Sequence, residues 1–224
     1  MILTQDRQTL AAGPFTRDVH LPPTGALQMT DIVLFHHIQG LTEGLRAIAD
    51  DWRAAGHTVH TPDLFAGQLP ASIDAGFALK EEIGEEVIQR RIADAIAPLP
   101  AEVVYAGFSW GVMTAQRLAQ TRPGARGAIL FEACIPITGD WAFGPWPDGV
   151  AVQIHGKDHD PFFAGEGDID AARELVAHVG PELGELFTYP GDQHLFADRS
   201  LSSYDASAAG LALERSRAFL DRLS

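Results

Sequence analysis

The chain has 224 residues, of which 46% are hydrophobic and 21% are charged, so it holds enough apolar sequence for a globular core and is neither disordered nor collagen-like. Its formal net charge of −14 would repel phosphate backbones and anionic lipids, so we expect neither nucleic acid nor a membrane as a partner. The single cysteine, Cys134, excludes a disulfide framework and a zinc ribbon and is typical of a cytoplasmic protein.

The pattern along the chain predicts one α/β domain over residues 1–224. The first residues, MILTQDRQTLAAG, lack the basic start and apolar run of a signal peptide. Short apolar runs then alternate with helix-period segments, which is typical of a mostly parallel sheet covered by helices. We expect strands at 31–36, 58–61, 102–108, 127–132, 150–155 and 185–189, and helices at 41–52, 90–96, 112–121, 169–179 and 207–223. Segment 64–86, rich in glycine, alanine and acidic residues, is expected to cover the mouth of the sheet.

The strongest motif is Gly107-Phe108-Ser109-Trp110-Gly111, which matches the G-x-S-x-G pattern of a nucleophile elbow. The elbow is a turn from strand to helix that is too tight for a Cβ two residues before or after the serine. An apolar run precedes the motif and a helix-period run follows it, as the elbow requires. The alternative is a glycine-flanked strand end with an inert serine. We favour Ser109 as a nucleophile.

A serine nucleophile needs a base and an acid, which follow it in that fold in the order serine, acid, histidine. His194 lies in a Pro-Gly loop after the last predicted strand, where a base has freedom to face the serine. The acid is expected in the loop after strand 150–155, where Asp158 and Asp160 compete. We favour Asp160 because Phe163 follows it as an apolar anchor, whereas Asp158 is followed at that spacing by proline.

An oxyanion needs two backbone N–H donors that point at it. The residue after the nucleophile, Trp110, is expected to supply one, and Ile38, in the loop after the first strand, the other. Three aromatic residues either wall an apolar substrate pocket or belong to a packed Pro-Gly loop: Trp141, Phe143 and Trp146.

The nine histidines raise the question of a metal site. His36 and His37 are adjacent and would point apart at a strand end, and the chain has no H-x-H unit. We therefore expect neither a metal nor another cofactor.

Four segments together resemble the dienelactone hydrolase family of α/β-hydrolases: VLFHHIQGL, AGHTVHTPDLFAG, YAGFSWG and YPGDQHLFAD. The resemblance runs from about Asp31 to the end of the chain. It implies one compact α/β-hydrolase domain without a large cap, which cleaves esters or lactones through an acyl-enzyme. It places the nucleophile on Ser109, the acid on Asp160 and the base on His194, with Ile38 and Trp110 as oxyanion donors.

The chain departs from the best-known members of that family at three positions. Those members have a cysteine nucleophile, a glutamate before the oxyanion donor and a carboxylate-binding arginine four residues after the base. Ser109, His37 and Asp198 stand at these positions here. We expect His37 and Asp198 to line the substrate pocket, with Asp198 near its mouth disfavouring anionic substrates.

The resulting hypothesis is a serine hydrolase that acts on a small carboxylic ester or lactone, as a monomer or homodimer. Two alternatives belong to other classes, a non-catalytic α/β-hydrolase-like binding domain and a metal-dependent hydrolase.

Overall fold

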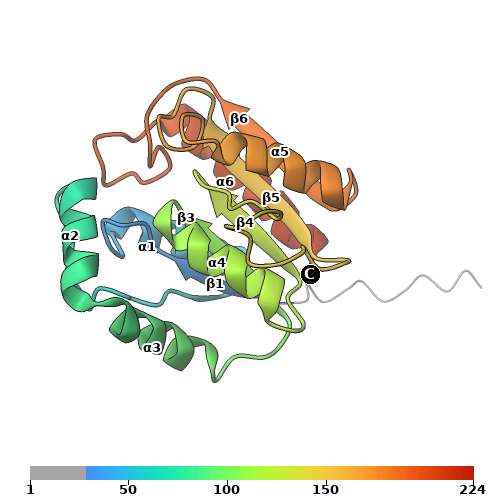
Figure 1. Cartoon of the computed structure of the whole chain (residues 1–224), viewed down its shortest axis with the longest axis horizontal. Coiled ribbons are helices and arrows are strands. Elements are labelled where there is room, and N and C mark those ends of the chain that lie inside the picture. The colour runs from blue at the N-terminus through green and yellow to red at the C-terminus, as the bar shows by residue number, and fades with distance from the viewer. Residues whose placement is uncertain (1–28) are drawn as a thin grey trace, which may run out of the picture.

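The computed structural model describes residues 29–224. The start of the chain, on which the expected absence of a signal peptide rests, lies outside these residues. Six strands form one sheet in the order β2-β1-β3-β4-β5-β6, and every neighbouring pair is parallel (Figure 1). The strands are β1 (Asp31–Phe35), β2 (Thr58–His60), β3 (Val103–Phe108), β4 (Gly127–Phe131), β5 (Ala151–Lys157) and β6 (Gly184–Tyr189).

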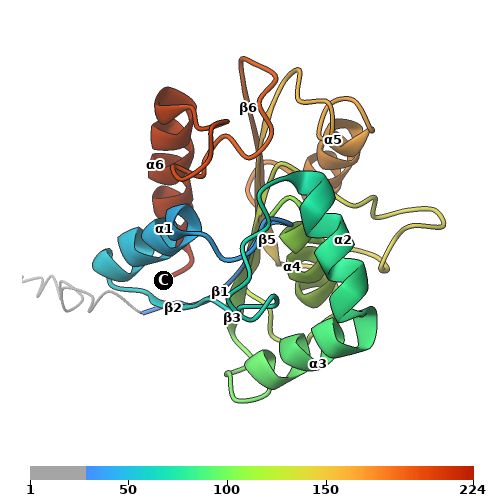
Figure 2. The same cartoon turned by 90° about the vertical axis from the view of Figure 1, so that its left-hand side faces the viewer.

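Six helices accompany the sheet in the described part of the chain. They are α1 (Glu43–Ala54), α2 (Ile73–Ile83), α3 (Glu85–Ile96), α4 (Trp110–Thr121), α5 (Asp168–Val179) and α6 (Ala206–Arg222). Helices α1 and α6 cover one face of the sheet, and α3, α4 and α5 cover the other (Figure 2). None of these helices combines the length and the apolar character that crossing a bilayer requires.

The strands are apolar on both sides because both faces of the sheet are covered. In β1, Ile32 and Leu34 pack toward α1 and α6, whereas Val33 and Phe35 join the core under α3, α4 and α5. Every residue of β3 is buried. This confirms the expected α/β architecture, and no large cap domain is inserted among residues 29–224.

Segment 64–86 contains a helix that the sequence analysis did not predict. Helix α2 is capped by Ser72, whose side chain accepts a hydrogen bond from the Ala75 N–H, and Gly84 ends it with φ 81°. Its Gly76 packs so tightly on the loop after β1 that an added Cβ would lie 2.2 Å from the Ile38 carbonyl oxygen. The segment therefore lies against the loop that follows β1, at the carboxyl edge of the sheet.

Other element boundaries shift by a few residues. Helix α3 begins at Glu85 and α4 at Trp110, both earlier than expected, and β5 continues to Lys157. That extension pairs Gly156 and Lys157 with Thr188 and Tyr189 of β6, and it carries β5 closer to the loop that holds Asp160.

Candidate active site

Ser109 occupies a strained turn between β3 and α4. Its φ of 47° and ψ of −117° lie in a region that non-glycine residues rarely adopt. A Cβ on Gly107 would lie 2.6 Å from the Gly111 carbonyl oxygen, and one on Gly111 would lie 2.5 Å from that of Phe35. Both glycines are thus required by close backbone approach, which is the physical basis of the G-x-S-x-G pattern. The Ser109 N–H donates to the Phe131 carbonyl at 2.7 Å, which ties the turn to the end of β4.

The structure brings Ser109, His194 and Asp160 into one hydrogen-bonded chain. His194 Nε2 lies 2.7 Å from Ser109 Oγ, and His194 Nδ1 lies 2.7 Å from Asp160 Oδ2. The other Asp160 oxygen accepts the N–H of Phe162 at 2.8 Å, so the buried carboxylate has a fixed orientation. The three residues follow β3, β6 and β5, because the carboxyl ends of parallel strands meet at one edge of the sheet.

Asp158, the competing acid, lies elsewhere. Its Oδ1 interacts with His159 Nδ1 at 2.7 Å and accepts the Gly191 N–H at 3.0 Å, and its side chain is 40% exposed. It is a turn residue that joins the loops after β5 and β6. The Phe163 side chain is fully buried and packs against Gly156, as expected for an anchor of the Asp160 loop.

The surroundings of His194 favour its protonated form. Burial alone would lower its pKa, but the hydrogen bond to Asp160 and the nearby carboxylates, Glu132 foremost, outweigh burial and raise the pKa. Because Asp160 interacts with His194 Nδ1, His194 Nε2 is free to accept the Ser109 proton. The arrangement suits a base that receives a proton and is then stabilised as an imidazolium.

Two backbone N–H groups near the elbow, those of Ile38 and Trp110, have no protein partner among the described residues. The Ile38 N–H, in the loop after β1, makes no hydrogen bond there, and Trp110 opens α4, where N–H groups have no partner within the helix. The close packing of Gly111 on the Phe35 and His36 carbonyls brings this loop against the start of α4. This placement is compatible with the oxyanion role expected of Ile38 and Trp110.

The expectation that His37 and Asp198 line an accessible pocket is wrong. Both side chains are buried, and His37 Nε2 lies 2.8 Å from Asp198 Oδ2. That oxygen also accepts the Thr42 hydroxyl, and Oδ1 accepts the N–H and hydroxyl of Ser200. These hydrogen bonds lower the pKa of Asp198 to about 2 even though burial opposes ionisation. The charge is satisfied inside the protein and does not face a substrate.

Neither Trp141 nor Trp146 lines a hollow that adjoins Trp110 or His194. Trp141 is 83% exposed, whereas Trp146 is buried and donates its indole N–H to the Val150 carbonyl at 2.8 Å. Val150 precedes β5, so Trp146 lies at the amino edge of the sheet, opposite the carboxyl edge that carries Ser109. The packed-loop alternative is the one that describes Trp146.

Two other buried histidines, His36 and His155, are held by hydrogen bonds to groups that do not include the acids of the site. His36 is buried between hydrogen bonds to the His37 carbonyl and the Leu64 N–H, and burial lowers its pKa to about 4. His155 is buried between Tyr189 and Gln153. Residues 29–224 contain no group of three or more histidine, cysteine or acidic side chains that is arranged to hold a metal ion.

Sequence reasoning missed two buried charged residues that flank the site. Lys157 ends β5 and binds Asp205, Gln193 and the Pro190 carbonyl, so it fixes the loop that precedes His194. Glu132 follows β4 and accepts the N–H of Phe196 at 2.6 Å. The only feature of the sequence that pointed to Lys157 or Glu132 was a charged residue at the end of an otherwise apolar run.

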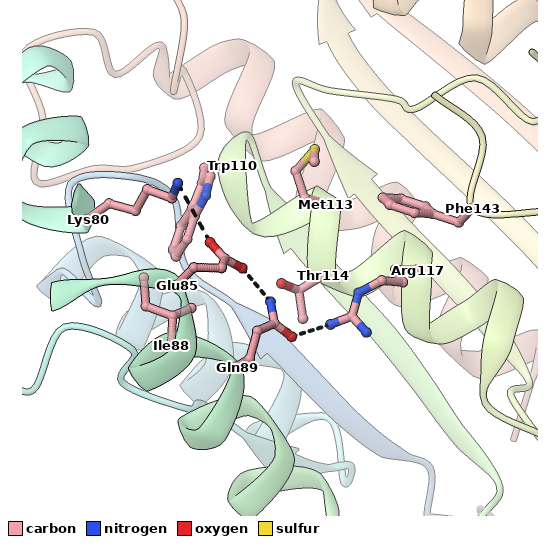
Figure 3. Close-up of a pocket in the computed structure, with 9 residues that line it drawn as sticks. All are labelled: Lys80, Glu85, Ile88, Gln89, Trp110, Met113, Thr114, Arg117 and Phe143. Carbon is pink, nitrogen blue, oxygen red and sulfur yellow. Dashed lines mark hydrogen bonds and ion pairs between the residues drawn. The ribbon is translucent and has the colours of Figure 1, made fainter. Parts of the chain in front are cut away.

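A hollow of about 460 Å³ opens beside Trp110, between α3 and α4 (Figure 3). It is lined by Lys80, Glu85, Ile88, Gln89, Trp110, Met113, Thr114, Arg117 and Phe143. Apolar side chains form part of the wall, and a chain of polar contacts from Lys80 through Glu85 and Gln89 to Arg117 forms the rest.

A second hollow, of about 470 Å³, includes His194 itself. Its lining is neutral apart from that histidine and comprises Gln39, Ala71, Ser72, Ile73, Leu195, Ser200, Leu201, Ser202 and Ser203. One hollow therefore adjoins the residue after the serine, and the other adjoins the histidine.

The model of the dienelactone hydrolase family matches residues 17–224. Among solved structures, the fold resembles a dienelactone hydrolase-like promiscuous phosphotriesterase from metagenomic libraries, with a TM-score of 0.66 at 16% identity over 89% of this chain and 88% of that one. It also resembles a thermophilic esterase from Thermogutta terrifontis with bound propionate, with a TM-score of 0.56 at 16% identity over 91% and 87% of the two chains. No curated protein sequence matches the chain. At these identities, the structural likeness establishes the α/β-hydrolase fold.

Proposed function

Because the chain belongs to the dienelactone hydrolase family, we propose that it is a serine hydrolase that cleaves a carboxylic ester or lactone through an acyl-enzyme intermediate. The observation that carries this proposal is the hydrogen-bonded chain from Ser109 through His194 to Asp160. A serine hydroxyl is a weak nucleophile until a base accepts its proton, and His194 Nε2 is at hydrogen-bond distance to do so.

The reaction begins when Ser109 Oγ attacks the carbonyl carbon of the substrate and its proton passes to His194 Nε2. Asp160 keeps the Nδ1 proton in place and stabilises the imidazolium. The Ile38 and Trp110 N–H groups donate to the oxyanion. The tetrahedral intermediate collapses as the ester C–O bond breaks, and the leaving oxygen takes the proton from His194. Water then attacks the acyl-enzyme, giving its proton to His194, and Ser109 regains a proton as the acid leaves.

The two hollows supply room for the two parts of an ester. The leaving oxygen has to lie within reach of His194 Nε2, so the hollow that includes His194 suits the alcohol part. The hollow beside Trp110 then suits the acyl part. Neither assignment relies on Asp198, whose carboxylate is buried, so the predicted preference for neutral over anionic substrates has lost its basis.

A fluorophosphonate probe and a panel of esters and lactones test the proposal. We expect the probe to label the wild-type protein and not Ser109→Ala, and we expect turnover of at least one ester or lactone by wild type alone. A protein that neither labels nor turns over any panel member would support the non-catalytic alternative. Activity that a chelator abolishes and zinc restores would support the metal-dependent one.

A further inference from the structure

Glu132 is a buried carboxyl at the carboxyl edge of the sheet that the proposed mechanism does not use. It directly follows β4, and the residue is only 1% exposed. Its φ of 64° lies in the left-handed region, which costs free energy for a residue with a Cβ. Its N–H donates to the His155 carbonyl at 2.7 Å, so this conformation is anchored to β5.

The carboxyl binds the backbone of the loop that carries His194. Glu132 Oε1 accepts the N–H of Phe196, two residues after His194, at 2.6 Å. Oε2 is buried and has no hydrogen-bond partner among the described residues. A buried carboxyl with an unused oxygen is costly. A strained backbone and an incompletely satisfied carboxyl at the same residue are features that packing alone does not favour.

The charged groups that face Glu132 come from the two loops of the proposed acid and base. His194 and Asp198 lie in the loop after β6, and Asp160 lies in the loop after β5. The nearest histidine of β5, His155, is engaged with Tyr189 and Gln153, and burial keeps its pKa near 3, so it is neutral. His194 is therefore the one facing group among these that gains positive charge near neutral pH.

The protonation of Glu132 and that of His194 are coupled. Burial raises the pKa of Glu132 to about 7, the attraction of His194 lowers it, and the repulsion of Asp160 raises it. The Glu132 charge in turn raises the pKa of His194. Because each charge shifts the pKa of the other group, the two groups share their titration steps.

We propose that Glu132 is a positioning residue for His194, which holds the histidine loop through the Phe196 N–H and supplies a second negative charge that stabilises the His194 imidazolium. Glu132 makes no hydrogen bond to the imidazole, so it acts through the loop and through its field, whereas Asp160 acts by direct contact. This inference rests on the proposed role of Ser109, His194 and Asp160 in acyl transfer.

The test compares Glu132→Gln with the control Glu214→Gln. The glutamine retains an oxygen for the Phe196 N–H and removes the charge, and Glu214 is exposed on α6. One readout is the pKa of the His194 imidazole from NMR titration of histidine-labelled protein, with its signal assigned by loss in His194→Gln. The other is the rate of fluorophosphonate labelling from about pH 5 to 9.

In Glu132→Gln we expect a lower pKa of His194, an acidic limb of the labelling profile that moves to lower pH, and a plateau rate reduced about tenfold. Glu214→Gln should match wild type in all three.

A folded Glu132→Gln variant in which the pKa of His194 and the labelling profile equal those of wild type would overturn the proposal. If Glu132→Gln does not fold, Glu132→Asp retains the charge and should keep the pKa of His194 raised. A folded Glu132→Asp variant in which the pKa of His194 is lowered would also count against the proposed role of Glu132.

The two readouts separate this inference from the proposed function. If wild type and Ser109→Ala label equally, the function fails. The NMR titration still reports whether Glu132 raises the pKa of His194, and an unchanged pKa in Glu132→Gln alone refutes the role of Glu132.

Discussion

His37 and Asp198, 161 residues apart in sequence, form a buried pair in which His37 Nε2 lies 2.8 Å from Asp198 Oδ2. His37 precedes Ile38 in the loop after β1, and Asp198 lies in the loop that carries His194. The pair therefore joins the loop of the proposed oxyanion donor to the loop of the proposed base.

Loss of this pair should weaken both stability and activity. In Asp198→Asn, the charge that binds His37, Thr42 and Ser200 is removed within a buried site, so we expect the free energy of unfolding to fall by about 1–3 kcal/mol. Urea denaturation measures this change. Asp192→Asn, an exposed substitution in the same loop, should be neutral, and an Asp198→Asn variant as stable as wild type would show that the pair contributes nothing.

The contribution of Asp198 should depend on pH in the acid range. Its pKa in the folded protein, about 2, lies below its ordinary value of 3.8. The carboxylate therefore stabilises the fold fully above the ordinary pKa, and this stabilisation is lost as the pH falls toward 2. The difference in unfolding free energy between wild type and Asp198→Asn should shrink over that window, as acid titrations followed by circular dichroism would reveal. A constant difference would contradict this assignment of the charge.

Replacement of the proposed nucleophile should abolish turnover without loss of the fold. We expect Ser109→Ala to lower kcat by at least ~10³-fold, because nucleophile, base and acid act as a unit. The variant should have at least the thermal stability of wild type, since it removes only a hydroxyl at a strained turn. Ser207→Ala, at an exposed position of α6, serves as the control, and near-normal turnover by Ser109→Ala would refute the proposed nucleophile.

The two aspartates of the loop after β5 should differ in their effect on catalysis. Asp160→Asn removes the carboxylate that lies 2.7 Å from His194 Nδ1, so we expect kcat to fall by roughly 10⁴-fold. Asp158→Asn changes only a partly exposed turn residue and should cost less than about tenfold. Steady-state kinetics of the two variants provides the comparison, and a more severe defect in Asp158→Asn would reverse the assignment.

The hollow beside Trp110 should limit the size of the acyl group. Met113 lines this hollow on α4, so Met113→Trp should reduce kcat/KM for p-nitrophenyl octanoate about tenfold more than for p-nitrophenyl acetate. Leu211→Trp is a matched control, because Met113 and Leu211 are both 45% exposed and Leu211 lies on α6 outside the hollow. Equal losses for the two esters would place the acyl chain elsewhere.

Features that depend on neighbours along the chain were the ones most readily predicted from the sequence. Strands such as β3 are apolar throughout because both faces of the sheet are covered, and such a strand can be recognised in the sequence as an unbroken apolar run. The elbow is local at Gly107, since the backbone atoms that exclude a Cβ there lie four and five residues further on, whereas Gly111 is required by the distant carbonyls of Phe35 and His36. The signals for α2 were local as well, with Ser72 at its start and Gly84 at its end, and the low apolar content of the segment obscured them.

Contacts between residues that lie far apart in the sequence depend on how the loops fold over the edge of the sheet. The tertiary structure placed Asp160 rather than Asp158 against His194, because the direction of each side chain depends on how the loop after β5 folds over Phe163. It turned Asp198 inward, because His37 and Thr42 offer hydrogen bonds that compensate the loss of water. The spacing to Phe163 favoured Asp160, but nothing in the sequence indicated the pairing of Asp198 with His37, because the free energy of a buried charge is set by the groups around it in space and not by its neighbours in the chain.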